Sequence, residues 1–514
     1  MTALRTRSLL IGAAAVLLVA GCSAGETSNG SSGNSTGGTE GGDARTDITI
    51  GFGAEPISFD FTQEDGVAIP EALLVNVYEG LVAVDDAGEI VPALASEWRV
   101  SDDGTVYDFT LNEGVTFSNG DEFTADDVKF SLDRVKSDAW TISLKSGMDI
   151  VESVEVVDDT HARVTLSAPN NSWLYTMTTR VGAMFSEAGV DNLAEDPVGT
   201  GPYDVSDRTP GESITLTRRD DYWREAPALE TVTLRYFQDG NALNNALLAG
   251  DIDVISNAST PESIDAQFGD TEQFQIIEGA TNGELVLSMN NTRAPFDDPL
   301  IRQAVMHALD RQAILDAALG GYGTVIGTMV PPHDPWFDES LVNMYPHDVA
   351  RAEQLLADAG YPDGIDVVFR PGSLPVAAAA VPIIEDQLNQ AGIRVTVDTQ
   401  EFPAQWIDVV LQQGDYDLSL MRHAEPRDIA TFADPDYYWH YDSQDFRDAL
   451  QAADTGSPDQ YAEQMRAASA LLAEDAAAGF LYVTSNVAVA ATGVTGLPTN
   501  RPGEAYDLTG IAWT

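Results

Sequence analysis

The stretch that decides the fold is residues 78–135, YEGLVAVDDAGEIVPALASEWRVSDDGTVYDFTLNEGVTFSNGDEFTADDVKFSLDRV. Within it, residues 107–111 alternate apolar and polar side chains, which predicts a half-buried strand. Turns containing glycine follow. Thr124, with Asp127 three positions later, then predicts the N-cap of a helix that runs to residue 135. This succession of strand, turn and helix predicts a mixed α/β protein.

Five further segments follow the first in a fixed order along the chain. They are PVGTGPYDV from residue 197, RRDDYWREAPALETVTLRYFQD from 218, ALLAGDIDVI from 246, SMNNTRAPFDDPLIRQAVMHALDR from 288 and ARAEQLLADAGYPDG from 350. Together with residues 78–135, they resemble the peptide/nickel (dipeptide and oligopeptide) class of extracellular solute-binding lipoproteins of bacterial ABC importers. Because their order and spacing extend over nearly the whole chain after residue 46, chance similarity is a poor explanation.

The resemblance implies an α/β fold of two lobes, a periplasmic-binding-protein-like clamshell with an additional subdomain in the first lobe. On that template residues 46–286 form the first lobe, with the subdomain at about 78–196. Residues 287–486 form the second lobe, and residues 487–514 return to the first. Independently, the strand, helix and strand order between residues 365 and 421 predicts a parallel α/β region. Similar patterns predict helices at residues 299–309, 348–359, 381–391 and 403–413.

The first 45 residues read as a leader and a linker. Arg5 and Arg7 precede an uncharged run at residues 9–20, typical of a signal peptide over residues 1–21. As a helix that run would be roughly 18 Å long, too short for a hydrocarbon core about 30 Å thick. The sequence VAGC ending at Cys22 resembles a lipobox, which implies acylation of this only cysteine. Residues 22–45 then form a flexible Gly/Ser linker; the alternative is a secreted protein with a buried cysteine near its start.

The charge balance restricts the partners of the protein. Lys and Arg number 26 and Asp and Glu 82, so the formal net charge is -56. Such a surface repels nucleic acid and anionic lipid headgroups, and we expect no nucleic-acid partner. Two explanations of the acidity stay open, adaptation to a salty exterior and attraction of cationic ligands.

The main candidate for solute contacts is the loop MRHAEPRD at residues 421–428. In the family that it resembles, the loop after this strand commonly supplies an acid to the α-amino group of a peptide. Here it departs from the Trp-containing, Asp-bearing forms. Glu425 or Asp428 could hold an ammonium group, and Arg422 could bind a carboxylate through two hydrogen bonds. His423 could be a pH-sensitive donor or a metal ligand, and each of the four could instead be an ordinary polar loop residue.

Other candidates lie outside this loop. The resemblance points to a loop before the helix that contains residue 78, which could also be a surface turn, and to the expected lobe crossings. The residues themselves add an aromatic segment and a weaker candidate at residues 328–332. The candidate residues are Glu64, Asp65, Val67, Asn290 (with Asn486 at the second crossing), Met329, Tyr438 and Trp439. The last two belong to ADPDYYWHY, residues 433–441, which suits either the wall of a cleft or a buried lobe seam.

We therefore expect an extracellular receptor, lipid-anchored to the cell membrane, that captures a small solute and delivers it to an ABC permease. Short peptides are the leading solute. The alternatives are an opine, a sugar or a chelated metal, or a ligand-sensing lipoprotein that is not coupled to import. His-Glu-x-x-His does not occur, Gly-x-Ser-x-Gly occurs only at residues 21–25, across the expected cleavage site, and at residues 33–37, in the expected linker, and no enzymatic activity is expected. We also expect a monomer without a cofactor or a metal site.

Overall fold

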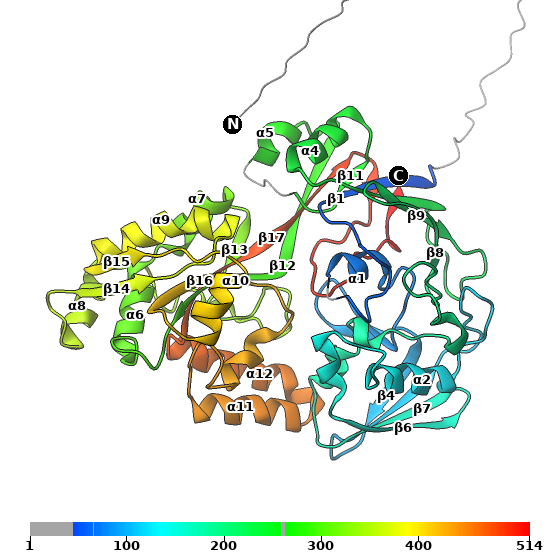
Figure 1. Cartoon of the computed structure of the whole chain (residues 1–514), viewed down its shortest axis with the longest axis horizontal. Helices are drawn as coiled ribbons and strands as arrows, with labels where there is room; N and C mark the ends of the chain where they lie inside the picture. The colour runs from blue at the N-terminus through cyan, green and yellow to red at the C-terminus, as the bar shows by residue number, and fades with distance from the viewer. Residues whose placement is uncertain (1–44, 65, 259–262) are drawn as a thin grey trace, which may run out of the picture. The chain divides into compact units, whose positions relative to one another are not determined.

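Two long strands organise the fold. β12 (Phe274–Met289) and β17 (Ala478–Ala491) pair antiparallel along nearly their whole length, and they lie side by side across the middle of Figure 1. The computed structural model describes residues 45–64, 66–258 and 263–514. In that part of the chain the main sheet has the order β15-β14-β16-β12-β17-β11-β1-β10-β9-β8, with β13 also paired to β17. The chain is therefore an α/β protein whose two lobes share one sheet through β12 and β17.

The strands on either side of this pair come from different halves of the chain. On the first-lobe side are β1 (Asp47–Phe52), β8 (Tyr203–Thr209), β9 (Ser213–Arg218), β10 (Thr231–Tyr236) and β11 (Val254–Ile255). On the second-lobe side are β13 (Gly323–Val325), β14 (Ile365–Phe369), β15 (Ile393–Val397) and β16 (Leu418–His423). β14 is parallel to both β15 and β16, which confirms the parallel region predicted between residues 365 and 421.

A separate antiparallel sheet lies within the first lobe. Its strands, in spatial order, are β4 (Ala95–Val100), β5 (Val106–Leu111), β7 (His161–Leu166) and β6 (Val151–Asp158). Helix α2 (Ala125–Val135) packs on β6 and β7. Its capping box between Thr124 and Asp127 is formed as predicted, and the helix buries Val128 and Leu132. Two short hairpins complete the strands: β2 (Val82–Val84) with β3 (Ile90–Pro92), and β18 (Val494–Thr495) with β19 (Ala512–Trp513).

Helices surround the sheets in both lobes. The first lobe has α1 (Ala68–Leu73), α3 (Trp173–Thr176), α4 (Gly240–Ala249) and α5 (Ile264–Phe268). The second has α6 (Pro299–Ala308), α7 (Arg311–Leu319), α8 (Val349–Asp358), α9 (Pro375–Gln390), α10 (Ala404–Trp406), α11 (Gln444–Thr455) and α12 (Tyr461–Glu474). Short 3-10 segments are η1 (Ser143–Met148), η2 (Arg180–Gly182), η3 (Glu187–Gly189), η5 (Glu339–Leu341), η7 (Asp428–Ala433) and η8 (Pro458–Gln460). None of the helices in the described ranges is both long and apolar enough to cross a membrane.

Two of these helices differ from the predictions. α9 begins six residues before the predicted residue 381, because Pro375 suits a first helical turn that needs no N–H donor there. The helix predicted at residues 403–413 is the short α10 followed by a π-helical segment, η6 (Ile407–Gln412).

The crossing between the lobes lies at a bulge in β12. Ala280 pairs with Ser485 and Glu284 with Val483, so the register shifts between them. On one side of the bulge Leu285 belongs to the apolar core of the second lobe, and on the other Val487 packs with first-lobe residues. The predicted lobe boundary at residue 286 follows the bulge by two positions. A bulge bends and twists the strand that carries it, which suits a hinge.

Candidate functional site

The loop at residues 421–428 begins beside this crossing. β16 pairs antiparallel with the second half of β12, so that Leu285 lies opposite Arg422 and Glu284 opposite His423. After His423 the chain leaves the sheet and enters η7 at Asp428. Sheet pairing alone therefore brings the predicted solute loop to the bulge of the crossing strands.

Arg422 is an exposed residue that lies against the crossing. A Cβ atom built at Gly283 would lie 2.8 Å from Arg422 Nη1, so the glycine leaves room for the guanidinium. Although the residue as a whole is exposed, the protein atoms packed around its charged group desolvate it, which lowers the pKa of Arg422, while the charge of Glu284 acts in the opposite direction. No hydrogen bond or ion pair joins this guanidinium to another of the described residues, and its N–H donors can serve a ligand.

Three other candidates contact one another instead. His423 Nδ1 lies 3.4 Å from Asp428 Oδ2, and His423 Nε2 lies 2.7 Å from Tyr438 Oη. Ser288 Oγ donates to the same Tyr438 oxygen at 2.9 Å. Burial raises the pKa of Asp428, and its hydrogen bond with His423 opposes this. This chain of polar contacts fixes the start and end of the loop to the strands beneath it, which is a positioning role.

The aromatic segment lies in the core under the loop. Tyr438 and Trp439 are both 0% exposed, and Met329 is 2% exposed in the same apolar cluster. The ring centroid of His423 lies 4.7 Å from that of Trp439. Of the two alternatives for this segment, the wall of a cleft and a buried seam, the burial of both rings favours the buried one, and the cleft wall is not what the structure shows.

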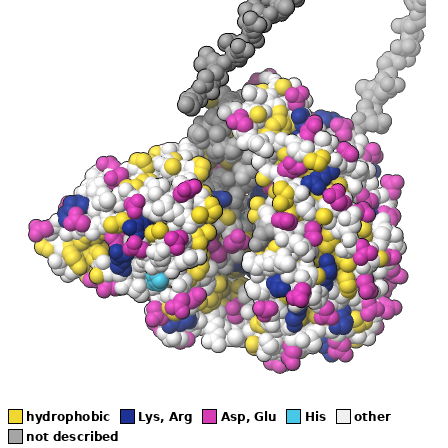
Figure 2. Space-filling model, viewed as in Figure 1, with side chains coloured by type: hydrophobic (Ala, Val, Ile, Leu, Met, Phe, Trp, Pro, Cys, Tyr) yellow, Lys and Arg dark blue, Asp and Glu magenta, His cyan; other side chains and the backbone are white. Residues whose placement is uncertain are grey.

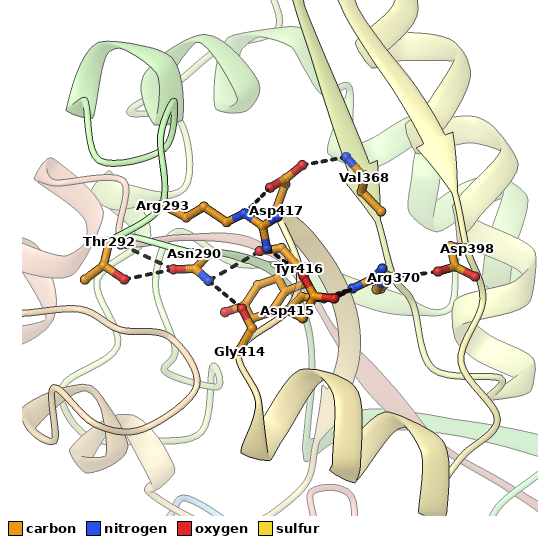
Figure 3. Close-up of polar contacts among 10 residues, drawn as sticks. All are labelled: Asn290, Thr292, Arg293, Val368, Arg370, Asp398, Gly414, Asp415, Tyr416 and Asp417. Carbon is orange, nitrogen blue, oxygen red and sulfur yellow. Dashed lines mark hydrogen bonds and ion pairs between the residues drawn. The ribbon is translucent and has the colours of Figure 1, made fainter.

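Asn290 is also placed differently from the expectation. It lies at the far end of β12 from the bulge, is 3% exposed and donates its amide to the carbonyl oxygens of Gly414 (3.0 Å) and Tyr416 (3.3 Å). Figure 3 shows this amide turned toward those carbonyls. Asn290 therefore fixes a turn within the second lobe, whereas Asn486 pairs with Gly279 at the crossing itself.

The remaining candidates are either exposed or outside the residues that the structure describes. Glu64 and Val67 are exposed, Val67 at 69%, and within the described ranges neither has a hydrogen bond or ion pair with the solute loop. Glu425 is an exposed residue on that loop. Asp65 and Cys22 lie outside the described residues.

The sequence patterns did not predict a group of buried ionisable residues beside the crossing. Glu284 is 2% exposed, and burial followed by the charge of Asp428 raises its pKa well above the ordinary value. Its Oε2 atom has no hydrogen-bond partner among the described residues. Burial raises the pKa of Asp334 to about 6 although Arg427 opposes it, and burial with Arg427 lowers the pKa of His333 to about 4. Groups perturbed in this way gather at functional sites.

One signal for this cluster was present in the sequence. Glu284 interrupts the otherwise apolar end of β12, and ionisable residues are rarely fully buried without a partner. Among the residues that the structure describes, no group of three or more His, Cys, Asp or Glu side chains is arranged to hold a metal ion.

A large cavity exists elsewhere in the first lobe. It has a volume of about 970 Å³ and lies between the β2–β3 hairpin, the turn at residues 222–228 and the returning segment at residues 496–510. No second-lobe residue lines it, and none of the candidate residues does. The position of the solute loop therefore favours the crossing over this cavity as the candidate site.

The surface around the site is strongly acidic. Figure 2 shows Asp and Glu side chains spread over both lobes with few Lys and Arg among them, and a hollow between the lobes on the face drawn.

Known proteins resemble this chain in sequence and in fold. Residues 89–448 match the bacterial extracellular solute-binding proteins, family 5 (middle region). The glutathione-binding protein GsiB of Escherichia coli K12 is 27% identical over 383 residues, which cover 70% of each chain. HbpA2 from Haemophilus parasuis has a TM-score of 0.82 at 22% identity, covering 91% of this chain and 100% of its own. The oligopeptide-binding protein AppA from Bacillus subtilis, solved with a nonapeptide, has a TM-score of 0.69 at 22% identity, covering 92% and 100%. The chain belongs to the family 5 extracellular solute-binding proteins, the solute receptors of ABC importers.

Proposed function

We propose that this receptor captures a short peptide or peptide-like solute that carries both a carboxylate and an ammonium group. The observation that carries the proposal is Arg422, an exposed arginine at the crossing whose guanidinium has no hydrogen bond or ion pair with the described residues. Glu425 is exposed three residues later on the same loop. Opposite charges on one loop match the two ends of a zwitterion. The glutathione-binding and nonapeptide-binding relatives support the same class of solute.

Each of the two residues has a separate role in this proposal. The planar guanidinium of Arg422 would bind the solute carboxylate through two parallel hydrogen bonds. Glu425 would accept hydrogen bonds from the ammonium group. Bending at the bulge between Ala280 and Glu284 would then bring the first lobe over the solute. Closure is favoured by contacts that the solute makes only when both lobes surround it.

The proposed setting is the outer face of the cell membrane. Acylation at Cys22 would tether the receptor, and residues 22–45 would let it reach a permease while remaining attached. We propose that it acts as a monomer and carries out no chemical conversion of the solute. The lipobox resemblance and the family support this assignment.

Mass spectrometry of solute released from natively purified protein tests the class of solute directly. Calorimetry with glutathione and with di- to pentapeptide pools then measures binding. We expect Arg422→Gln to weaken binding tenfold or more, about 1.4 kcal/mol. Arg351→Gln, which changes an exposed arginine on α8, is the matched control and should leave affinity unchanged. Absence of binding to every pool would exclude peptides as the solute.

A further inference from the structure

Arg427, near the end of the solute loop, has an unusual backbone and an unusual environment. Its φ of 57° and ψ of 30° lie in the left-handed region, which few residues other than glycine adopt. Its side chain is only 11% exposed. Such a conformation persists where the surrounding contacts determine it, and these contacts come from both lobes.

The guanidinium of Arg427 lies between two aromatic rings, one from each lobe. Its central carbon is 3.6 Å from the ring centroid of Tyr175, in α3 of the first lobe, and 4.6 Å from that of Trp336, in the second-lobe core. Tyr175 is itself fixed, because its hydroxyl donates to the Pro502 carbonyl at 2.7 Å. Cations within about 6 Å of a ring are attracted to it, most strongly where water is excluded.

The tip of the β2–β3 hairpin gives Arg427 a second first-lobe contact. Arg427 Nη2 donates to the carbonyl oxygen of Gly88 at 3.3 Å. Gly88 has a φ of +75°, and a Cβ atom at this position would lie 2.4 Å from the carbonyl oxygen of His333 in the second lobe. The hairpin tip is thus in close contact with the second lobe, and only glycine fits there.

Within its own lobe Arg427 is held less firmly. Asp334 Oδ1 lies 3.8 Å from Arg427 Nε, beyond hydrogen-bond distance. The same Nε atom has no hydrogen-bond partner among the described residues. The shortest contacts of this cation are therefore with the first lobe.

We propose that Arg427 is a positioning residue that couples the solute loop to closure of the lobes. Solute held by Arg422 and Glu425 orders the loop, and the ordered loop presents Arg427 to Tyr175 and Gly88. These contacts exist only when the lobes are together, so they slow solute release and leave solute entry unaffected. The claim that bound solute orders the loop rests on the proposed function, whereas the contact of Arg427 with the first lobe does not.

A second contact between the lobes provides a matched control. Asn171 in the first lobe donates its amide to the carbonyl oxygens of Ala453 (2.7 Å) and Gly456 (3.1 Å) at the end of α11. Its backbone N–H donates to the Asp454 carbonyl at 2.9 Å. Neither the solute loop nor the hairpin tip takes part. Asn171→Ala therefore weakens contact between the lobes without changing Arg427.

Hydrogen exchange of residues 85–89 tests the coupling in the full-length chain, without added solute and with glutathione or a dipeptide pool. The variants are compared in the state, with or without solute, in which the backbone amides of residues 85–89 exchange slowly. In that state we expect Arg427→Gln and Tyr175→Leu each to raise the exchange rate of these amides tenfold or more. Tyr175→Phe keeps the ring and should retain protection, and Arg427→Lys should give an intermediate rate. Asn171→Ala removes a contact between the lobes but none at the hairpin tip, so it should raise exchange at residues 85–89 by less than Arg427→Gln or Tyr175→Leu does. Where a pool binds, Arg427→Gln should speed solute dissociation tenfold or more at an unchanged association rate.

The outcomes separate this inference from the proposed function. Unchanged exchange at residues 85–89 in both Arg427→Gln and Tyr175→Leu would overturn the coupling, even if peptides bind. Increased exchange in these two variants would support it, even if no peptide pool binds and the proposed solute class is wrong. Tyr175→Leu, in the other lobe, keeps the test valid if Arg427→Gln does not fold.

Discussion

Two charged clusters of the second lobe differ in how their charges are balanced. We call one the Arg293–Arg370 network; its members are Arg293, Arg370, Asp398, Asp415 and Asp417. We call the other the crossing cluster; its members are Glu284, Asp334, Arg422, Arg427 and Asp428. In the first, shown in Figure 3, every carboxylate contacts an arginine at 2.6–3.0 Å. In the second, all three acids are buried with raised pKa values, and Arg422 has no protein partner among the described residues.

The difference supports the proposal that the crossing cluster serves the solute, whereas the Arg293–Arg370 network serves the structure. Arginine hydrogen bonds lower the pKa of Asp415, as expected where ionised groups are already satisfied. In the crossing cluster, burial makes the charged forms unfavourable, so the fold maintains this arrangement at a cost in stability. Buried charged groups without compensating partners are typical of sites that bind a ligand or change conformation.

The largest expected effect is on the free energy of unfolding of the protein, and it comes from Asp334 of the crossing cluster. The pKa of Asp334 is raised from 3.8 to about 6, so the folded protein holds this proton more tightly than the unfolded chain. Its contribution to stability is therefore full below pH about 4 and is lost as pH rises to about 6. Two units correspond to about 3 kcal/mol. We expect Asp334→Asn to be more stable than the parent above pH 6 by up to that amount, measured by urea unfolding across pH.

An acid of opposite behaviour lies four residues away and serves as the control. Hydrogen bonds from Ser340 lower the pKa of Asp338, so its contribution to stability is present above pH about 4 and is lost in more acidic solution. Asp338→Asn should therefore not gain stability above pH 6. If Asp334→Asn proved less stable than the parent at pH 7, the charge of Asp334 would be compensated by its neighbours, and the crossing cluster would not differ from the Arg293–Arg370 network.

The next effect concerns the contact that the crossing cluster makes with the first lobe. A methyl group in Gly88→Ala would lie 2.4 Å from the His333 carbonyl oxygen, which prevents the hairpin tip from seating. We expect solute affinity, measured by calorimetry, to fall tenfold or more. Gly114 has the same φ of +75° with open space around it, so Gly114→Ala carries the same backbone strain without the clash. Equal affinities for the two variants would contradict a seated hairpin tip.

Local patterns predicted the elements of this fold, and the resemblance predicted its two lobes. Thr124 with Asp127 located α2, and the strand order after residue 365 located the parallel region. The loop at residues 421–428 could also be located, since it directly follows a recognisable strand, and its contact with the solute stays a prediction. The partners within the site were not predictable, because His423 reaches Tyr438, and Arg427 reaches Tyr175, through contacts between segments far apart in sequence. The spacing of apolar residues predicts which face of a helix or strand is buried, but it does not predict which residues that face contacts.

The smallest effect is expected in the Arg293–Arg370 network, where removal of one charge leaves the others paired. Asp398 is 54% exposed and contacts Arg370, which also contacts Asp415 at 2.6 Å. Exposed ion pairs contribute about 0–1 kcal/mol, so Asp398→Asn should lower the free energy of unfolding by less than about 1 kcal/mol. Raising the salt from 0.15 to 1 M should shrink this difference, because the screening length falls from about 8 to about 3 Å. Solute affinity should not change. A loss above about 2 kcal/mol, or weakened solute binding, would show that this network supports the site as the crossing cluster does, and the contrast between the two clusters would no longer hold.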